Sequence, residues 1–142
     1  MKEYTIKEIS EMFHMPSSTI RYYEGVGILT NVARNKNGQR IYTEDHVNRL
    51  KTICCFKDTG MSIAELQAFF TYEANEATHI VDILDLLNHR EILVLEQMEQ
   101  LAKAQAQVLR KIHYYQDIQT AMTKHRPLPK WDNYRNKTYQ TR

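Results

Sequence analysis

The order of hydrophobic and polar positions predicts four short helices and one hairpin within residues 1–77. A capping box at Thr5 begins a first helix, whose apolar residues recur with helical spacing up to about Phe13. After a short break we expect Ser17 or Ser18 to cap a second helix, which glycine then ends. Two short helices joined by so tight a turn are typical of a helix-turn-helix.

An Asn-Gly pair at residues 37–38 predicts a hairpin, because both central residues of a type I′ turn need a positive φ. This hairpin would form a wing beside the helix-turn-helix. Thr43 is then expected to cap a third helix that stops at Gly60, and a second capping box begins a fourth helix at Ser62. The pattern over residues 1–77 therefore predicts a winged helix-turn-helix domain.

Residues 78–124 contain neither glycine nor proline, and their apolar residues recur in steps of three and four, as in a coiled coil. A narrow apolar stripe on a helix of about 70 Å cannot be buried by that helix alone. A second copy of the chain is the simplest partner, in parallel or antiparallel orientation. The residues expected at this dimer interface are Leu84, Leu87, Val94, Met98, Leu101, Val108, Ile112 and Tyr115.

Composition narrows the class of protein further. The 142 residues carry a net charge of only +2, so bulk charge does not indicate a nucleic-acid partner. Four glycines and three prolines argue against a many-stranded β fold and leave a mainly α fold. Two adjacent cysteines form no disulfide framework, and no apolar stretch is long enough to cross a membrane. We therefore expect a cytoplasmic protein without a membrane partner.

The second predicted helix carries side chains suited to DNA. In a helix-turn-helix, the N-terminal residues of this helix reach base edges in the major groove. The planar fork of Arg21 matches the acceptors of guanine, and hydroxyl groups such as that of Tyr22 suit phosphate oxygens. Tyr23 is instead expected in the core. The wing adds Arg34, Lys36 and Arg40, as suits a basic hairpin lying along the backbone or in a minor groove.

Taken together, several segments resemble the MerR family of bacterial transcription regulators. They are RYYEGVGIL, VARNKNGQRIY, TEDHVNRLKTI and FKDTGMSIAEL, followed by the long heptad helix. The resemblance implies a dimer with antiparallel long helices that binds within a promoter spacer. It also implies that an effector makes this dimer distort the spacer for RNA polymerase. Carried over from the family, the DNA contacts fall on Thr5, Ser17, Thr19, Arg21, Tyr22, Arg34, Gly38, Arg40 and Tyr42.

The effector is not identified by the sequence. Metal-sensing members of the family carry cysteines on and after the long helix, whereas residues 78–142 contain none, so we expect no metal and no cofactor. Cys55, five residues before Gly60, resembles the cysteine of the aldehyde- and thiol-stress subgroup. Two interpretations stay open for it: a sensor of electrophiles or oxidants, or a buried inert thiol. Cys54 lies on the apolar stripe of its helix and is expected in the core.

Residues 125–142 form a basic tail with Trp131, Tyr134 and Tyr139. Three roles are open for this tail: a lid folded over the third helix and covering an effector, a disordered extension, or an element that stabilises the dimer. The main alternative function is a coiled-coil module whose winged helix binds protein rather than DNA. We do not expect an enzyme, because the sequence shows no Cys-His-acid set around Cys55 and no glycine-rich loop.

Overall fold

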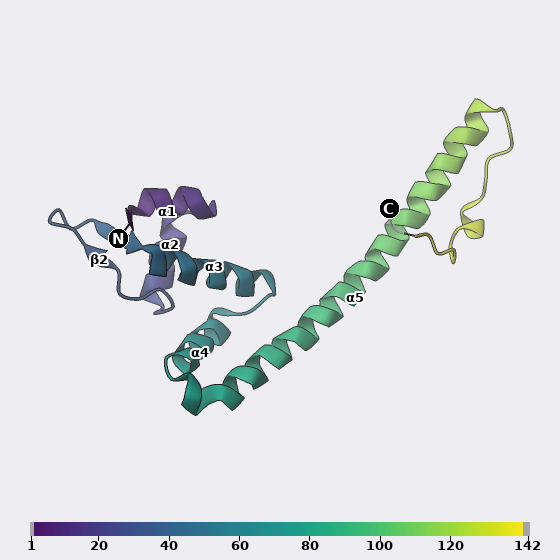
Figure 1. The fold of residues 1–142 in the computed structure, drawn as a ribbon. Coiled ribbons are helices and arrows are strands. Elements are labelled where there is room, and N and C mark those ends of the chain that lie inside the picture. Colours follow the sequence, from purple (N-terminus) through teal and green to yellow (C-terminus); the bar gives the residue numbers. More distant parts are fainter. Residues whose placement is uncertain (1, 141–142) are drawn as a thin grey trace. The chain divides into compact units, whose positions relative to one another are not determined.

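The computed structural model describes residues 2–140 and confirms a mainly α fold with a small sheet (Figure 1). Contacts divide the chain into two compact units, Met1–Glu91 and Ile92–Arg142. The elements are β1 (Glu3–Tyr4), α1 (Ile6–Phe13), α2 (Ser17–Gly25), β2 (Ala33–Arg34), β3 (Arg40–Thr43), α3 (Glu44–Asp58), α4 (Ile63–Glu73), α5 (Glu76–Thr123) and the 3₁₀ helix η1 (Trp131–Asn133).

The starts of α1 and α4 are fixed locally, as predicted. Thr5 Oγ1 accepts a hydrogen bond from the Glu8 backbone N–H, and the Glu8 carboxylate accepts one from the Thr5 N–H, both at 3.1 Å. Ser62 and Glu65 make the same reciprocal pair at α4. The second helix differs from the prediction, because Pro16 is its N-cap and Ser17 is already helical. The proline ring holds φ at −58°, so no side-chain cap is needed to set the entry of the chain.

The hairpin is present, but the type I′ turn predicted for it is wrong. Gly38 has a φ of +77°, whereas Asn37 does not have a positive φ. The Gly38 N–H instead donates to the Asn35 carbonyl at 3.0 Å, which makes a type I turn followed by a left-handed glycine. The Asn35 side chain closes the loop by accepting from the backbone N–H groups of Asn37 and Gln39. We call residues 33–43 the wing.

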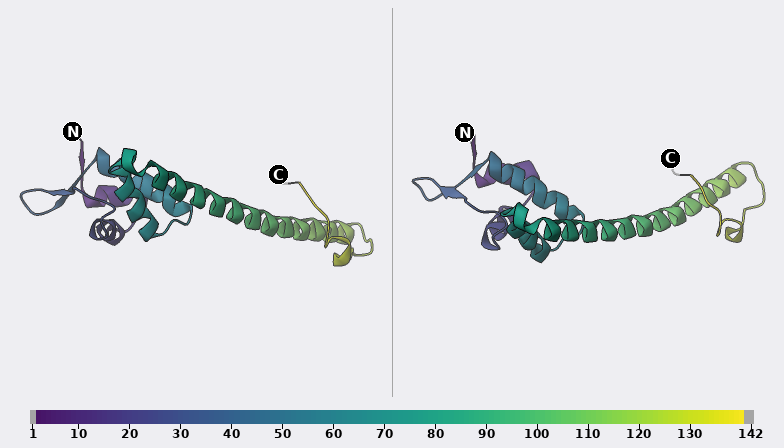
Figure 2. Two further views of the ribbon diagram at one scale, coloured as in Figure 1. Left: turned by 90° about the horizontal axis from the view of Figure 1, so that it is seen from below. Right: turned by 60° about the horizontal axis from the view of Figure 1, so that its bottom comes forward.

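The strands of the wing, β2 and β3, form a three-stranded antiparallel sheet with β1, in the order β1-β3-β2. Glu3 pairs with Thr43 and Tyr4 with Tyr42, so the start of the chain lies along β3. Thr43 then caps α3 as predicted, with the His46 ring nitrogen Nδ1 accepting from its backbone N–H. The loop of the wing projects away from the helices of its unit in Figures 1 and 2.

One hydrophobic core joins the helices and the sheet of the first unit. Its fully buried members include Ile9 of α1, Ile20 of α2, Leu50 of α3 and Leu66 of α4. Cys54, which was expected in this core, is only half-buried. Gly60 ends α3 with a φ of +86°, a conformation that residues with a Cβ rarely adopt.

The first unit continues past residue 77 into α5. Ile83, Leu86 and Leu87 pack against the core of the first unit, and His79 interrupts the helical dihedrals with φ −113° and ψ 20°. Leu87, which was expected at a dimer interface, is thus partly buried by its own chain, and its place at that interface stays a prediction. Within residues 2–140, no helix is long and apolar enough to cross a membrane.

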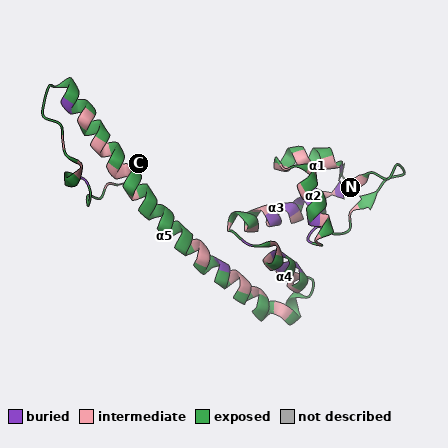
Figure 3. Cartoon of the chain, turned by 180° about the vertical axis from the view of Figure 1, so that it is seen from behind, coloured by how far each residue is buried: buried purple, intermediate pink, exposed green. Residues whose placement is uncertain are grey.

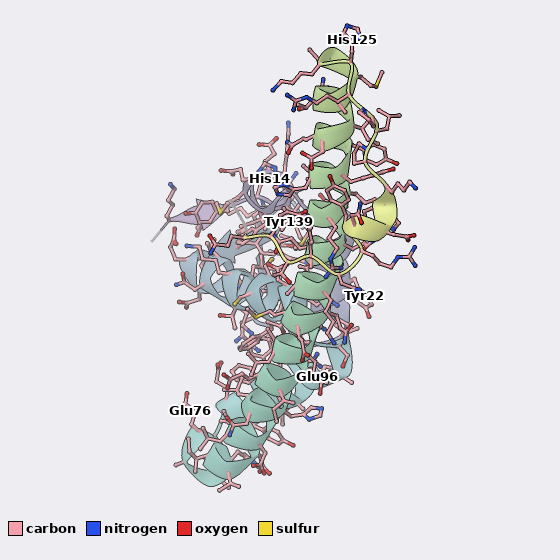
Figure 4. The ribbon with its side chains drawn as sticks, turned by 90° about the vertical axis from the view of Figure 1, so that its right-hand side faces the viewer. His14, Tyr22, Glu76, Glu96, His125 and Tyr139 are labelled. Atoms are coloured by element: carbon pink, nitrogen blue, oxygen red, sulfur yellow. The ribbon has the colours of Figure 1, made fainter. Side chains whose placement is uncertain are left out.

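The tail of the second unit lies against α5. The chain turns at His125 and runs back beside the helix to Tyr139 (Figure 4). Tyr134 is buried and donates to Asp117, the Lys111 ammonium lies 3.7 Å from the Trp131 ring centroid, and Tyr139 stacks on a histidine of α5. The expectation of a disordered tail is therefore wrong for residues 125–140, which pack against α5. The lid over the third helix stays a prediction.

Candidate nucleic-acid interface

Helix α2 is anchored by one face and open on the other. Ile20 and Tyr23 are buried in the core, which confirms the prediction for Tyr23, and burial raises the pKa of its phenol. Arg21 is exposed, and Tyr22 keeps 51% of its surface accessible. Because the buried pair fixes the rotation of the helix, the guanidinium and the phenol beside it are held on the solvent side.

The first turn of α2 places two further predicted residues. Ser17 and Thr19 are half-buried there, and the Thr19 backbone N–H donates to the Pro16 carbonyl at 3.0 Å. Other backbone N–H groups of this turn lack partners within the helix, so the helix end favours an anion such as a phosphate.

The wing presents three predicted residues at its exposed end, Arg34 at the end of β2 and Lys36 and Gly38 in the loop. Arg34 Nη1 donates to the Gly38 carbonyl at 2.7 Å, which holds the guanidinium across the turn. Arg34, Lys36 and Gly38 are all exposed. A projecting loop with two cations has the shape and charge to contact a phosphate backbone.

The base of the wing is tied to α2 by a carboxylate that the sequence analysis missed. Arg40 Nε donates to Glu24, 3.1 Å from Oε1 and 3.0 Å from Oε2, and the Tyr42 hydroxyl donates to Glu24 Oε2 at 3.0 Å. Glu24 is the only acidic residue between Glu11 and Glu44, and this isolation was the signal available in the sequence.

This arrangement corrects the prediction for Tyr42. Its side chain is fully buried and its hydroxyl is engaged by Glu24, so it offers no surface to a duplex in this conformation. Burial, followed by the hydrogen bond to Glu24, raises the pKa of Tyr42. Arg40 is also less accessible to DNA than predicted, because its side chain is only 26% exposed and is paired with Glu24.

Thr5 lies close to the wing although it is distant in sequence. It lines one groove together with Lys7, Arg40 and Ile41. The pairing of β1 with β3 brings them together, because it carries the start of α1 alongside the wing. Thr5 is exposed, so its hydroxyl remains accessible while it caps α1. The structure thus gathers Thr5, the wing and α2 in one compact unit.

The two cysteines differ in their surroundings. Cys55 is exposed in the single chain, which contradicts the expectation of a buried thiol and leaves its reactivity untested. Cys54 is half-buried, and burial, helped by the negative charge of Asp58, raises the pKa of its thiol. Among residues 2–140 there is no group of three or more histidine, cysteine or carboxylate side chains placed to hold a metal ion.

Helix α5 is largely exposed in the single chain (Figure 3), and most of its apolar stripe is exposed with it. Leu101 keeps 72% of its surface accessible, and Val94 is half-buried. The other exposed members are Leu84, Met98, Val108, Ile112 and Tyr115. Exposed apolar rows of this extent are typical of protein–protein contact surfaces.

Comparisons with known proteins agree with this geometry. The model of the MerR HTH family regulatory protein matches residues 4–73. The HTH-type transcriptional regulator AdhR of Bacillus subtilis is 33% identical over 66 residues, which are 46% of this chain and 47% of AdhR. The chain thus spans about half the length of the curated relatives it matches.

Two solved structures extend the similarity beyond the winged helix. HiNmlR, described as a MerR family regulator lacking the sensor domain and bound to promoter DNA, matches with a TM-score of 0.75 at 26% identity, over 88% of this chain and 92% of HiNmlR. A transcriptional regulator of the MerR family from Bacillus thuringiensis matches with a TM-score of 0.67 at 31% identity, over 79% of this chain and 98% of that protein. The fold, the winged helix-turn-helix and these similarities together show that the chain belongs to the MerR family of HTH regulatory proteins.

Proposed function

We propose that this chain acts as a homodimer that binds one promoter, distorts its spacer in response to an effector, and so lets RNA polymerase engage both promoter elements. The observation that carries the proposal is the joint presentation of Arg21 on α2 and of the basic wing by one compact unit. HiNmlR, whose crystal structure contains promoter DNA, supports the DNA partner.

The proposed DNA contacts are the exposed or half-buried members of the predicted set. They are Thr5, Ser17, Thr19, Arg21, Tyr22, Arg34, Gly38 and Arg40. Bending or untwisting a spacer costs on the order of 1–10 kcal/mol, so the contacts on both sides of the distortion have to offset that cost. Two copies of the unit supply twice the contacts of one.

The proposed dimer forms through α5. Its exposed apolar stripe needs a helix of comparable length as partner, and a second α5 provides one. The tail supports this assignment. Tyr114, Asp117 and Ala121 contact the tail or are buried near it, and helical geometry places them on roughly the opposite side from Val108 and Ile112. The tail and a partner helix therefore use different faces.

For the effector, we propose electrophile or thiol stress sensed at Cys55. Its exposure supports this role, because a sensing thiol has to be reached by its reagent. Cys55→Ser is expected to leave DNA binding intact and to abolish the response to an added aldehyde. A serine variant that still responds in full would remove Cys55 as the sensor.

The test of the main proposal is transcription in vitro with purified bacterial RNA polymerase. Templates carry a duplex sequence selected by the protein within an ordinary or an overlong promoter spacer. With an aldehyde added as the effector, the proposal predicts stimulation on the overlong spacer, and an Arg21→Ala variant should not stimulate. Failure of the wild-type chain to bind any duplex in a salt-dependent manner would favour the alternative, a winged helix that binds protein.

A further inference from the structure

We propose that Glu24 is a positioning residue for DNA binding: its carboxylate holds Arg40 of the wing against helix α2, so that the helix and the wing engage the duplex as one unit. The inference rests on the proposed DNA contacts and adds a residue that is not itself among them.

The geometry gives Glu24 two partners on the wing and leaves it little freedom. Its two carboxylate oxygens accept from Arg40 Nε at 3.0–3.1 Å, and Oε2 also accepts from the Tyr42 hydroxyl at 3.0 Å. The Glu24 side chain is 18% exposed and that of Arg40 is 26% exposed, so the pair is partly shielded from solvent. Partly buried charged hydrogen bonds of this kind are stronger than exposed surface ion pairs.

Tyr42 makes the arrangement rigid. Its ring is fully buried in the core and lies edge-on to His46, with the ring centroids 5.7 Å apart. The hydroxyl therefore approaches Glu24 from a fixed point of β3 rather than from a mobile surface side chain. Through Glu24, the position of β3 is transmitted to α2, although Arg40 and Tyr42 are 16 and 18 residues from Glu24 along the chain.

The contact with Glu24 orients the remaining hydrogen-bond donors of Arg40 for binding to DNA. A guanidinium has five N–H donors, and the contact with Glu24 uses the one on Nε. The four hydrogens on the two Nη atoms suit a phosphate oxygen pair. Because Nε is held, these hydrogens need less ordering when the duplex arrives, which lowers the entropic cost of binding.

Simple electrostatics predicts the opposite effect for Glu24. It is the only acidic residue among residues 12–43, and this segment contains most of the proposed DNA contacts. A carboxylate close to phosphates repels them, so replacing it with a neutral residue should strengthen binding if its charge were all that mattered. A positioning role predicts that the same replacement weakens binding, and the sign of the change separates the two.

The experiment uses the full chain and a duplex that the wild-type protein selects from a random-sequence library. Glu24→Gln keeps the shape of the side chain and removes its charge, and Glu11→Gln removes an exposed charge of the same unit as the matched control. We expect Glu24→Gln to bind about tenfold more weakly, the lower end for a charged hydrogen bond. Glu11→Gln should bind as the wild type does or slightly more tightly.

Two further measurements distinguish positioning from loss of structure. If Glu24 acts through Arg40, adding Glu24→Gln to Arg40→Gln should cost nothing more in affinity. Glu24→Gln should also lower the slope of log affinity against log salt by about one, as the loss of one phosphate contact does. Tyr42→Phe removes one of the two ties and keeps the buried ring, so we expect a loss of about threefold, smaller than that of Glu24→Gln.

The outcomes separate the inference from the proposed function. If the wild-type chain selects no duplex, the proposed function is wrong and the inference falls with it. If the wild-type chain selects a duplex and Glu24→Gln binds it as tightly or more tightly, the inference alone is overturned. Additive losses in the Glu24→Gln, Arg40→Gln double variant would also overturn it.

Discussion

Arg90 of α5 donates from Nη2 to both carboxylate oxygens of Glu65 of α4, at 2.6 and 2.7 Å. Arg90 is only 9% exposed, and its Nη1 lies 3.4 Å from the Thr59 carbonyl in the turn between α3 and α4. Its Nε has no hydrogen-bond partner among the described residues. The pair thus ties the start of α5 to the turn that follows the cysteines, at the cost of burying a guanidinium.

The ion pair predicts how stability depends on pH. Arg90, the largest influence, holds the pKa of Glu65 below its usual value. The stabilisation is therefore full above about pH 4.3, the value for an unfolded chain, and is lost as the pH falls through the lower folded pKa. Glu65→Gln keeps a side chain that can form the capping box but leaves Arg90 buried without its counter-ion. We expect it to lower the free energy of unfolding by about 2 kcal/mol at pH 7.

Urea unfolding at pH 7 and in acid, at one protein concentration, measures this difference. The gap between the wild type and Glu65→Gln should close as the pH falls below 4, while Glu11→Gln, a variant of an exposed carboxylate, should show almost no gap at pH 7. A gap that stays constant with pH would mean that the charge of Glu65 is not what stabilises the turn.

The two cysteines should react at different rates. Cys55 is exposed, whereas Cys54 is half-buried and its raised pKa leaves less thiolate at neutral pH. With limiting N-ethylmaleimide, we expect Cys55 to be modified several-fold faster, as read by mass spectrometry of peptides. Cys54→Ser and Cys55→Ser, which each leave one thiol, provide the matched pair. Equal rates in these two variants would contradict the assigned difference.

Arg21 should contribute to sequence preference. Arg21→Ala is expected to cost about 1–3 kcal/mol in binding to a selected duplex and to relax the preference at the base it contacts. Arg135→Ala, which removes an exposed arginine that pairs with Asp132 in the tail, is the control of equal charge. Footprinting compares the two variants, and operator protection by Arg21→Ala equal to that of the control would remove Arg21 from the contact set.

The tail should respond to loss of a single hydroxyl. The Tyr134 hydroxyl donates to Asp117, and this bond, together with burial, raises the pKa of Tyr134 to about 12. Tyr134→Phe removes the bond and should loosen the tail by about 1 kcal/mol. Trp131 is the only tryptophan and is half-buried, so acrylamide quenching of its fluorescence reports the change. The control is Tyr139→Phe, which keeps the ring that stacks on His113. In this variant, acrylamide should quench the Trp131 fluorescence as it does in the wild type.

The predictable parts of the fold are those set by neighbouring residues. The capping boxes at Thr5 and Ser62 each join residues three apart, and the stripe of α5 is a repeat that any single helix displays. The turn of the wing was predicted wrongly because Asn35, outside the Asn-Gly pair, closes a loop that is one residue longer.

The parts of the site that escaped prediction depend on distant contacts. Tyr42 was expected to contact DNA because the resemblance to the MerR family places a contact at this position, and only the packing of β3 buries it. Glu24 meets its partners across 16 to 18 residues, a relationship that no local pattern encodes. The side of α5 that contacts the tail carries Tyr114 and Asp117. Both lie outside the apolar stripe, so the sequence pattern predicted no contact for them.

The central claim is that two chains joined through α5 set two DNA-binding units on one promoter. Sedimentation of the chain at micromolar concentration, with and without a selected duplex, tests it directly. We expect the mass of two chains alone and of two chains on one duplex, and Leu101→Lys on the exposed stripe should yield single chains with much weaker binding. Single wild-type chains in solution and on the duplex would contradict the account.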